Sequence, residues 1–121
     1  MEEQCIRRKR IFVKNKICFC TLEVAITLIG GKWKTMIIYH LKDGAMRSSN
    51  LQRCLIGISN KMFTQSLREL EDYGLVERIV YLEVPPKVEY NLTELGLSVL
   101  PIVLELQQWG SRISDRFEHE D

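Results

Sequence analysis

The sequence predicts a single, mostly α-helical domain with a small β-hairpin, an α+β fold. One observation is a helical pattern in which Phe63, Leu67 and Leu70 form one apolar stripe. A second is Gly74, a residue type that often ends a helix, directly after that pattern. A third is residues 76–92, two short runs rich in β-branched and aromatic side chains. A helix followed directly by a hairpin is therefore the centre of the predicted fold.

The predicted helix over residues 60–73 also has a polar face, opposite its apolar stripe. The acidic residues of this helix are confined to its last turn, so its N-terminal half would not repel a polyanion. Such a helix can enter a DNA major groove, although an ordinary solvated face has the same composition. At about 100° per residue, four side chains that donate hydrogen bonds share the polar face: Lys61, Thr64, Gln65 and Arg68.

The predicted hairpin has strands over residues 76–82 and 88–92, joined by a loop with two adjacent prolines. Proline fixes φ and has no amide donor, so the loop is expected to be stiff and to project. It ends at Lys87, whose ammonium could reach a phosphate or the edge of the minor groove. With Ser59 as the expected N-cap of the helix, this order of elements is that of a winged helix-turn-helix.

The other elements fit the same fold. Helices are expected to begin at the N-cap Thr21 and at Lys32, on either side of a Gly-Gly break, with Trp33 anchored in the core. Residues 45–47 are expected to add a third strand to the hairpin. A short helix over residues 49–55, with Ser48 as its N-cap, precedes the helix of residues 60–73, and its inward side chains are expected to be Leu51, Cys54 and Leu55.

The terminal segment, with Thr93 as its expected N-cap, carries more apolar side chains than one helix face can hold. A surface helix of a monomer has one apolar stripe, so the excess indicates two packing partners. One partner is the domain itself and the other is a second copy of the chain. We therefore expect a homodimer formed through the terminal helices, with contacts from Leu95, Val99, Ile102, Val103, Leu106, Trp109 and Ile113.

Composition places the chain among ordinary single-domain proteins, with 121 residues, 45% hydrophobic, 27% charged and a net charge of +1. No signal-peptide pattern and no apolar run of about 18 residues is present, so we expect a cytoplasmic protein that does not enter a membrane. Charge is distributed unevenly along the chain. We expect a basic arm over residues 1–16, partly helical at Ile11–Val13 and able to follow phosphates or to be disordered, a DNA-binding and dimerisation domain over residues 17–113, and an acidic tail over residues 114–121.

Motifs for catalysis or metal binding are absent from the sequence. The two histidines are His40, inside a predicted core helix, and His119, in the tail. Cys18 and Cys20 form a pair without the second pair that a zinc site needs. The glycines before Lys32 lack the spacing of a phosphate-binding loop. We expect no enzymatic activity, no cofactor and no metal.

Cys20 is the cysteine whose surroundings indicate reactivity. It precedes a predicted helix start and follows Lys14 and Lys16, and both features stabilise a thiolate. An oxidant could then act on Cys20 and change DNA binding. The alternative interpretation is an inert cysteine that only packs.

Several sequence runs carry a resemblance to a known family. They are Cys20, residues 29–33 (IGGKW), residues 59–78, residues 84–90 (VPPKVEY), Leu92-Thr93, Gly96 and Trp109. With these runs the chain resembles the HxlR-type winged-helix transcriptional regulators, relatives of the MarR group. The resemblance spans roughly residues 20–109. Thr21 stands where family members usually have proline, and Ser48 and Asn50 stand where they usually have an aromatic residue and an acid.

The resemblance implies a homodimeric regulator, most simply a repressor, that binds a pseudo-palindromic double-stranded DNA operator. It also implies that Cys20 matches the cysteine with which certain members sense oxidants or electrophiles. It identifies no effector. The alternative function is a winged helix that docks on another protein without binding DNA. The candidate DNA contacts are Ser59, Lys61, Thr64, Gln65, Arg68 and Lys87, with Lys32 and Lys34 as weaker phosphate contacts.

Overall fold

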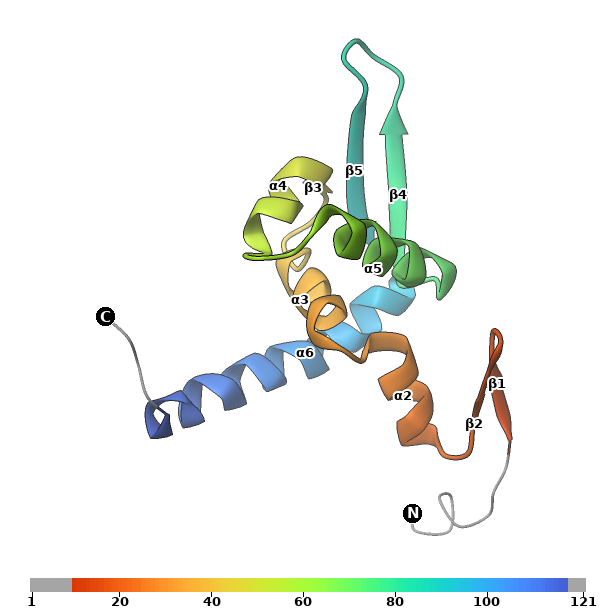
Figure 1. The fold of residues 1–121 in the computed structure, drawn as a ribbon, viewed down its shortest axis with the longest axis vertical. Coiled ribbons are helices and arrows are strands. Elements are labelled where there is room, and N and C mark those ends of the chain that lie inside the picture. The colour runs from red at the N-terminus through yellow and green to blue at the C-terminus, as the bar shows by residue number, and fades with distance from the viewer. Residues whose placement is uncertain (1–9, 118–121) are drawn as a thin grey trace.

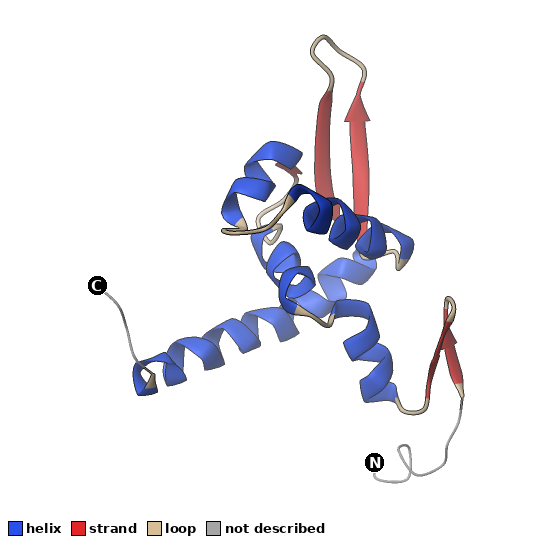
Figure 2. Cartoon of the chain, in the orientation of Figure 1, coloured by secondary structure: helices blue, strands red, loops and turns tan. Residues whose placement is uncertain are grey.

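The computed structural model describes residues 10–117 (Figure 1). A wing of two long strands projects from a group of helices, and the terminal helix extends away from that group in another direction (Figures 1 and 2). Along the chain the elements are β1 (Ile11–Val13), β2 (Lys16–Cys18), α2 (Thr21–Ile29), α3 (Lys32–His40), β3 (Met46–Arg47), α4 (Ser48–Cys54), α5 (Asn60–Asp72), β4 (Val76–Tyr81), β5 (Lys87–Leu92), α6 (Glu94–Ile113) and the 3-10 turn η1 (Ser114–Arg116).

The hydrophobic core lies where α3, α4 and α5 meet the base of the wing. The apolar spacing predicted for α5 is confirmed, because Phe63, Leu67 and Leu70 are all buried. Trp33 is partly buried and packs against this core, as predicted. The buried cluster consists of Ile37, Ile38, Leu41, Leu51, Leu55, Phe63, Leu67, Leu70, Leu75, Val76, Tyr90, Leu92 and Val103.

The wing is a three-stranded antiparallel sheet with the order β3-β5-β4. Strands β4 and β5 pair from Val76 opposite Leu92 to Tyr81 opposite Lys87. The predicted third strand is confirmed, because Met46 pairs with Tyr90 on the other side of β5. Only the base of the wing packs on the helices, so its tip is free to meet a partner (Figure 2).

Both ends of α5 are fixed by local hydrogen bonds that the sequence predicts. The Ser59 hydroxyl accepts a hydrogen bond from the Met62 amide at 3.0 Å, as an N-cap does. At the other end Gly74 has φ +79°, a conformation that suits glycine. The Leu75 amide donates to the Leu70 carbonyl and the Gly74 amide to the Glu71 carbonyl, both at 2.9 Å, which is the Schellman pattern.

The N-terminal region differs from the prediction. The expected helical character at Ile11–Val13 is wrong, because these residues form a strand that pairs with Lys16–Cys18. The pairing is possible because Lys14 adopts φ +56° in the turn between them. Residues 1–9 of the predicted basic arm lie outside the described residues. The rest of the arm leads into this small hairpin. Cys20, not Thr21, is the N-cap of α2.

Helix α4 also departs from the prediction at both ends. Arg47 occupies the N-cap position, so Ser48 is the first residue of the helix. Cys54 is exposed, and its predicted inward position is wrong. Helix α4 ends at Cys54, and the other two side chains predicted to face inward, Leu51 and Leu55, are buried.

Candidate nucleic-acid interface

The solvent face of α5 brings the predicted groove contacts together. Lys61, Thr64, Gln65 and Arg68 are all exposed, and with Asn60 they line one shallow depression of the surface. The opposite face of the helix is buried in the core, so the rotation of α5 about its axis is fixed. A helix held in this way presents two cations and two neutral side chains with hydrogen-bond donors to one partner, as a major groove requires.

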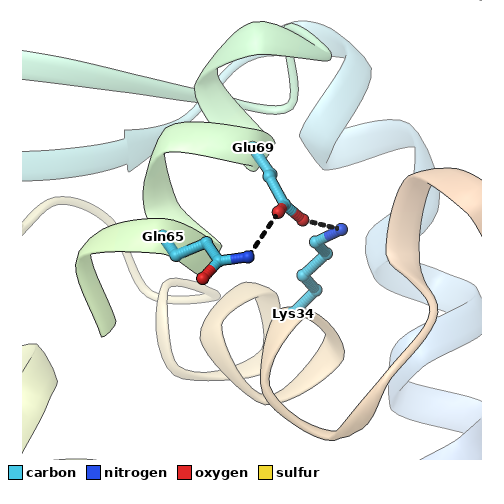
Figure 3. A network of polar contacts seen from close by, with 3 residues as sticks. All are labelled: Lys34, Gln65 and Glu69. Carbon is cyan, nitrogen blue, oxygen red and sulfur yellow. Dashed lines mark hydrogen bonds and ion pairs between the residues drawn. The ribbon is translucent and has the colours of Figure 1, made fainter. Parts of the chain in front are cut away.

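Lys34 does not belong to this face, and its predicted role as a phosphate contact is wrong. Its side chain is only 11% exposed, and its Nζ lies 2.5 Å from Glu69 Oε1 (Figure 3). The ammonium also lies 5.3 Å from the centre of the Tyr73 ring. The hydrogen bond from Lys34 holds the pKa of Glu69 below its ordinary value, so the carboxylate stays ionised. Lys34 thus neutralises an acid beside the α5 face.

A second basic region lies in a groove between α4 and the wing. Sequence reasoning missed two of its residues, Arg47 and Arg78, which are both exposed. Arg47 precedes α4, and Arg78 lies in β4 two strands away in the sheet. The predicted third strand was the signal that could have found Arg47, since it carries this residue to the wing. The groove is lined by Arg47, Ser48, Ser49, Gln52, Arg78, Pro86, Lys87, Val88 and Tyr90.

Lys87 lies at the start of β5 and is held on the side of the wing. Its Nζ lies 3.4 Å from Glu89 Oε2 and 4.5 Å from the centre of the Tyr81 ring. The Tyr81 hydroxyl donates to Glu89 Oε1 at 3.0 Å, and this bond raises the pKa of Tyr81. The charge of Lys87 is therefore partly compensated, whereas the two arginines of the groove carry no ion pair to Glu89.

Lys32 is exposed at the start of α3, as a phosphate contact needs. Its Nζ lies 4.5 Å from the centre of the Trp33 ring, so the side chain rests on an aromatic surface rather than extending freely. Trp33 and Lys32 line a groove that also includes Met62 and Gln65 of α5. Lys32 therefore lies beside the α5 face.

The residues predicted to dimerise differ in their exposure to solvent. Leu95, Ile102, Leu106 and Trp109 are each about half exposed, from 49% to 56%, while Val99 and Ile113 are partly buried. Val103 is only 4% exposed and belongs to the core, so its predicted role in dimer contacts is wrong. It lies on the side of α6 that packs on α3, next to Met36 and Tyr39. One apolar face of α6 thus packs on α3, and the other remains largely exposed to solvent.

The three described cysteines are free thiols in different surroundings. Cys18 is buried, and its Sγ lies 3.5 Å from Thr27 Oγ1. Cys20 is partly exposed at the N-cap of α2. Cys54 is exposed at the end of α4. Of the two cysteines near the start of α2, Cys20 is thus the one that solvent reaches.

Residues 28–118 match the family described as HxlR-like helix-turn-helix. The chain belongs to this family. Among its relatives, the uncharacterized HTH-type transcriptional regulator YkvN of Bacillus subtilis is 50% identical over 97 residues, 80% of this chain and 82% of that protein. An uncharacterized HTH-type transcriptional regulator of Methanothermobacter thermautotrophicus is 49% identical over 100 residues, 83% of this chain and 76% of that protein.

Solved structures of similar regulators have the same fold. The redox regulator HypR in its oxidized form superposes with a TM-score of 0.75 at 44% identity, covering 84% of this chain and 99% of that one. Its reduced form gives 0.74 at 47% identity, covering 78% and 93%. The chain is therefore a DNA-binding transcriptional regulator of the winged helix-turn-helix class. None of the helices between residues 10 and 117 is long and apolar enough to cross a membrane.

Proposed function

We propose that this HxlR-like regulator acts in the cytoplasm as a homodimeric repressor of a pseudo-palindromic operator, read by the two α5 helices. The observation that carries this proposal is the one-sidedness of α5. Its four predicted groove contacts are exposed together while its other face is fixed in the core. In a dimer with twofold symmetry, two such helices enter successive major grooves about one helical turn apart. Occupancy of the operator then blocks transcription.

Phosphate contacts on both sides of the DNA major groove would fix the register of each α5 helix. The cations come from Lys32 at the start of α3 and from three residues in the groove beside the wing: Arg47, Arg78 and Lys87. Such contacts carry no sequence information, but they dominate affinity and make it depend on salt. The proposal therefore assigns base reading to α5 and phosphate binding to its neighbours.

The homodimer is supported by apolar side chains that the single chain leaves in solvent. Ile102, Leu106 and Trp109 of α6 are all about half exposed, and the later turns of this helix extend away from the other helices (Figure 1). Apolar side chains of α2 are exposed too, with Leu22 at 65% and Ile26 at 57%. Large exposed apolar patches on a protein mark interaction sites. A second copy that covers both helices would bury these side chains.

Thiol oxidation at Cys20 is the proposed signal. The related protein HypR is a redox regulator by name, with oxidized and reduced structures. A hydroperoxide would convert the Cys20 thiolate to a sulfenic acid as the peroxide O–O bond breaks and water or an alcohol leaves. Condensation with the same cysteine of a second copy forms a disulfide and releases water. This bond adds a constraint between the two halves of the dimer, so the spacing of the two α5 helices changes and simultaneous docking fails.

The DNA-binding part is tested by titrating the protein onto the DNA upstream of its own gene at several salt concentrations. We expect affinity to fall steeply with salt. Arg68→Ala should weaken operator binding by about 1–3 kcal/mol. The matched control is Arg116→Ala, which removes an exposed arginine at the other end of the molecule. Intact affinity in Arg68→Ala would show that the α5 face is assigned wrongly, and binding to protein but not to duplex DNA would reject the repressor.

The redox part is tested by the same titration after mild treatment with a hydroperoxide and then a thiol reductant. We expect loss and recovery of operator binding in the parent chain, and no response in Cys20→Ser. Cys18→Ser and Cys54→Ser are the controls, and both should respond like the parent. An unchanged response in Cys20→Ser would remove Cys20 from the mechanism and leave the DNA-binding proposal intact.

A further inference from the structure

Gln65 is the groove residue of α5 whose side chain is already held in place without DNA. Its Nε2 donates to Glu69 Oε2 at 3.2 Å, one helical turn along the same helix (Figure 3). The other carboxylate oxygen, Glu69 Oε1, accepts from Lys34 Nζ at 2.5 Å. Lys34 comes from α3 and is almost buried, so the chain of contacts ends on the body of the domain and not on a mobile surface group.

This chain of contacts decides which way the Gln65 amide faces. A carboxylate has no hydrogen to give, so only the amide nitrogen, and not the amide oxygen, can lie against Glu69. Because Lys34 keeps Glu69 ionised, the carboxylate remains an acceptor. The two orientations of the amide, which a free glutamine on a surface would exchange, are therefore reduced to one.

The remaining hydrogen-bonding groups of Gln65 form a defined pattern. One of the two Nε2 hydrogens is used by Glu69, which leaves one N–H donor and the Oε1 acceptor. In the major groove adenine alone offers the complement on one base, with its N7 as acceptor and its N6 amino group as donor. Guanine offers two acceptors, and the pyrimidines lack the pair.

We propose that Gln65 reads an adenine in each half-site, and that Lys34 and Glu69 are positioning residues that fix its amide for this contact. The proposal rests on the proposed function, since it requires that the α5 face meets the major groove. It adds the base that one position of the operator must carry. Lys34 and Glu69 act through Gln65 and touch no base.

The experiment uses the full chain and a pool of DNA duplexes with a randomised central segment, whose bound fraction is sequenced. The parent chain should select adenine, or thymine on the other strand, at one position of each half-site by about tenfold. Gln65→Ala should reduce the preference at that position to less than about twofold and leave the other positions unchanged. The double variant Lys34→Met with Glu69→Met should reduce the same preference by a similar factor.

Two further variants separate positioning from structural damage. Lys42→Met with Glu71→Met removes the same two charges away from Gln65 and should keep the full preference for adenine. Glu69→Gln keeps the shape of the side chain, but its amide can donate or accept, so it should lower the preference by about threefold. Circular dichroism establishes that each variant is folded before the selection, and Glu69→Gln carries the test if the double variant is not.

Each remaining outcome decides the question. A guanine or cytosine at the position that Gln65→Ala alters, no preferred base at any position, or a full preference retained in Gln65→Ala overturns the assignment of Gln65. A full preference retained in both Glu69 variants overturns the positioning role. If Lys61→Ala and Arg68→Ala weaken binding while Gln65→Ala changes no preference, this inference fails and the proposed function stands. If the parent binds no duplex at low salt, the proposed function itself fails.

Discussion

Gly96 and Leu75 touch through their backbones at the junction of α6 and the wing. A Cβ atom on Gly96 would stand 2.1 Å from the Leu75 carbonyl oxygen. That oxygen accepts a hydrogen bond from the Thr93 amide at 3.1 Å, and the Thr93 hydroxyl accepts one from the Gly96 amide at 3.1 Å. The end of α5, the base of the wing and the start of α6 are thus joined over a few residues, which ties the proposed dimer helix to the proposed DNA-binding face.

Gly96→Ala should destabilise the protein by about 1–3 kcal/mol, because backbone must move to admit the new methyl group. Urea denaturation at fixed protein concentration measures the loss. Gly110→Ala is the matched control on the same helix, where a Cβ meets nothing within 4 Å. There alanine should raise stability by roughly 0.5–1 kcal/mol, since glycine is a poor helix former. Equal effects of the two substitutions would contradict the close contact.

Ser59→Ala should cost about 1 kcal/mol of stability, because the Met62 amide loses the hydroxyl that caps α5. The same denaturation experiment checks this. Ser111→Ala, a change of the same chemistry at an exposed position inside α6, should be neutral or slightly stabilising. A neutral Ser59→Ala would show that the cap is replaced by water without loss.

The Lys34–Glu69 pair should make stability depend on pH below the neutral range. The folded-state pKa of Glu69 is lowered, so its contribution is complete above its ordinary value of 4.5 and is lost as pH falls through the lowered value. Lys34→Met should therefore cost up to about 1 kcal/mol near pH 7, since Glu69 is partly exposed and solvent weakens the pair. The difference from the parent should shrink toward zero once Glu69 is protonated. A difference that is independent of pH would mean that Lys34 acts by packing alone.

Arg47→Ala and Arg78→Ala should each weaken DNA binding to the same extent for all sequences. The slope of log affinity against log salt should fall by about one for each protomer that docks, because one phosphate contact is lost. Filter binding at several salt concentrations gives the slope. Arg116→Ala should leave it unchanged, and a change in base preference in either groove variant would contradict the assignment to phosphates.

Trp109→Asp should convert the proposed dimer to a monomer, because it places an unpaired charge in the apolar contact. The dissociation constant of the dimer should rise by at least about a hundredfold, because an uncompensated charge is then buried. Sedimentation over a range of concentrations measures this. Ser111→Asp adds the same charge on the opposite side of α6 and should leave the dimer intact. A folded parent chain that sediments as a monomer at micromolar concentration would contradict the homodimer itself.

The sequence by itself determined the order of the elements from α2 to α6 and the centre of the fold. The stripe of Phe63, Leu67 and Leu70, the cap at Ser59 and the stop at Gly74 all act within a few residues of one another. Such short-range signals do not depend on the rest of the chain, so α5 and the wing were predicted at almost their observed bounds. The polar face of α5 followed from the same periodicity.

Only the tertiary structure decided how the faces are used. Lys34 is a cation of the type that contacts phosphates, yet the packing of α3 on α5 turns it toward Glu69. Val103 is one apolar residue among many in α6, and the contact with α3 alone places it in the core. Arg47 and Arg78 are distant in sequence and share a groove because β5 pairs with strands on both sides. Periodicity gives the angle between side chains on one helix, but the rotation of that helix against its neighbours is set by the packing of segments far apart in the chain.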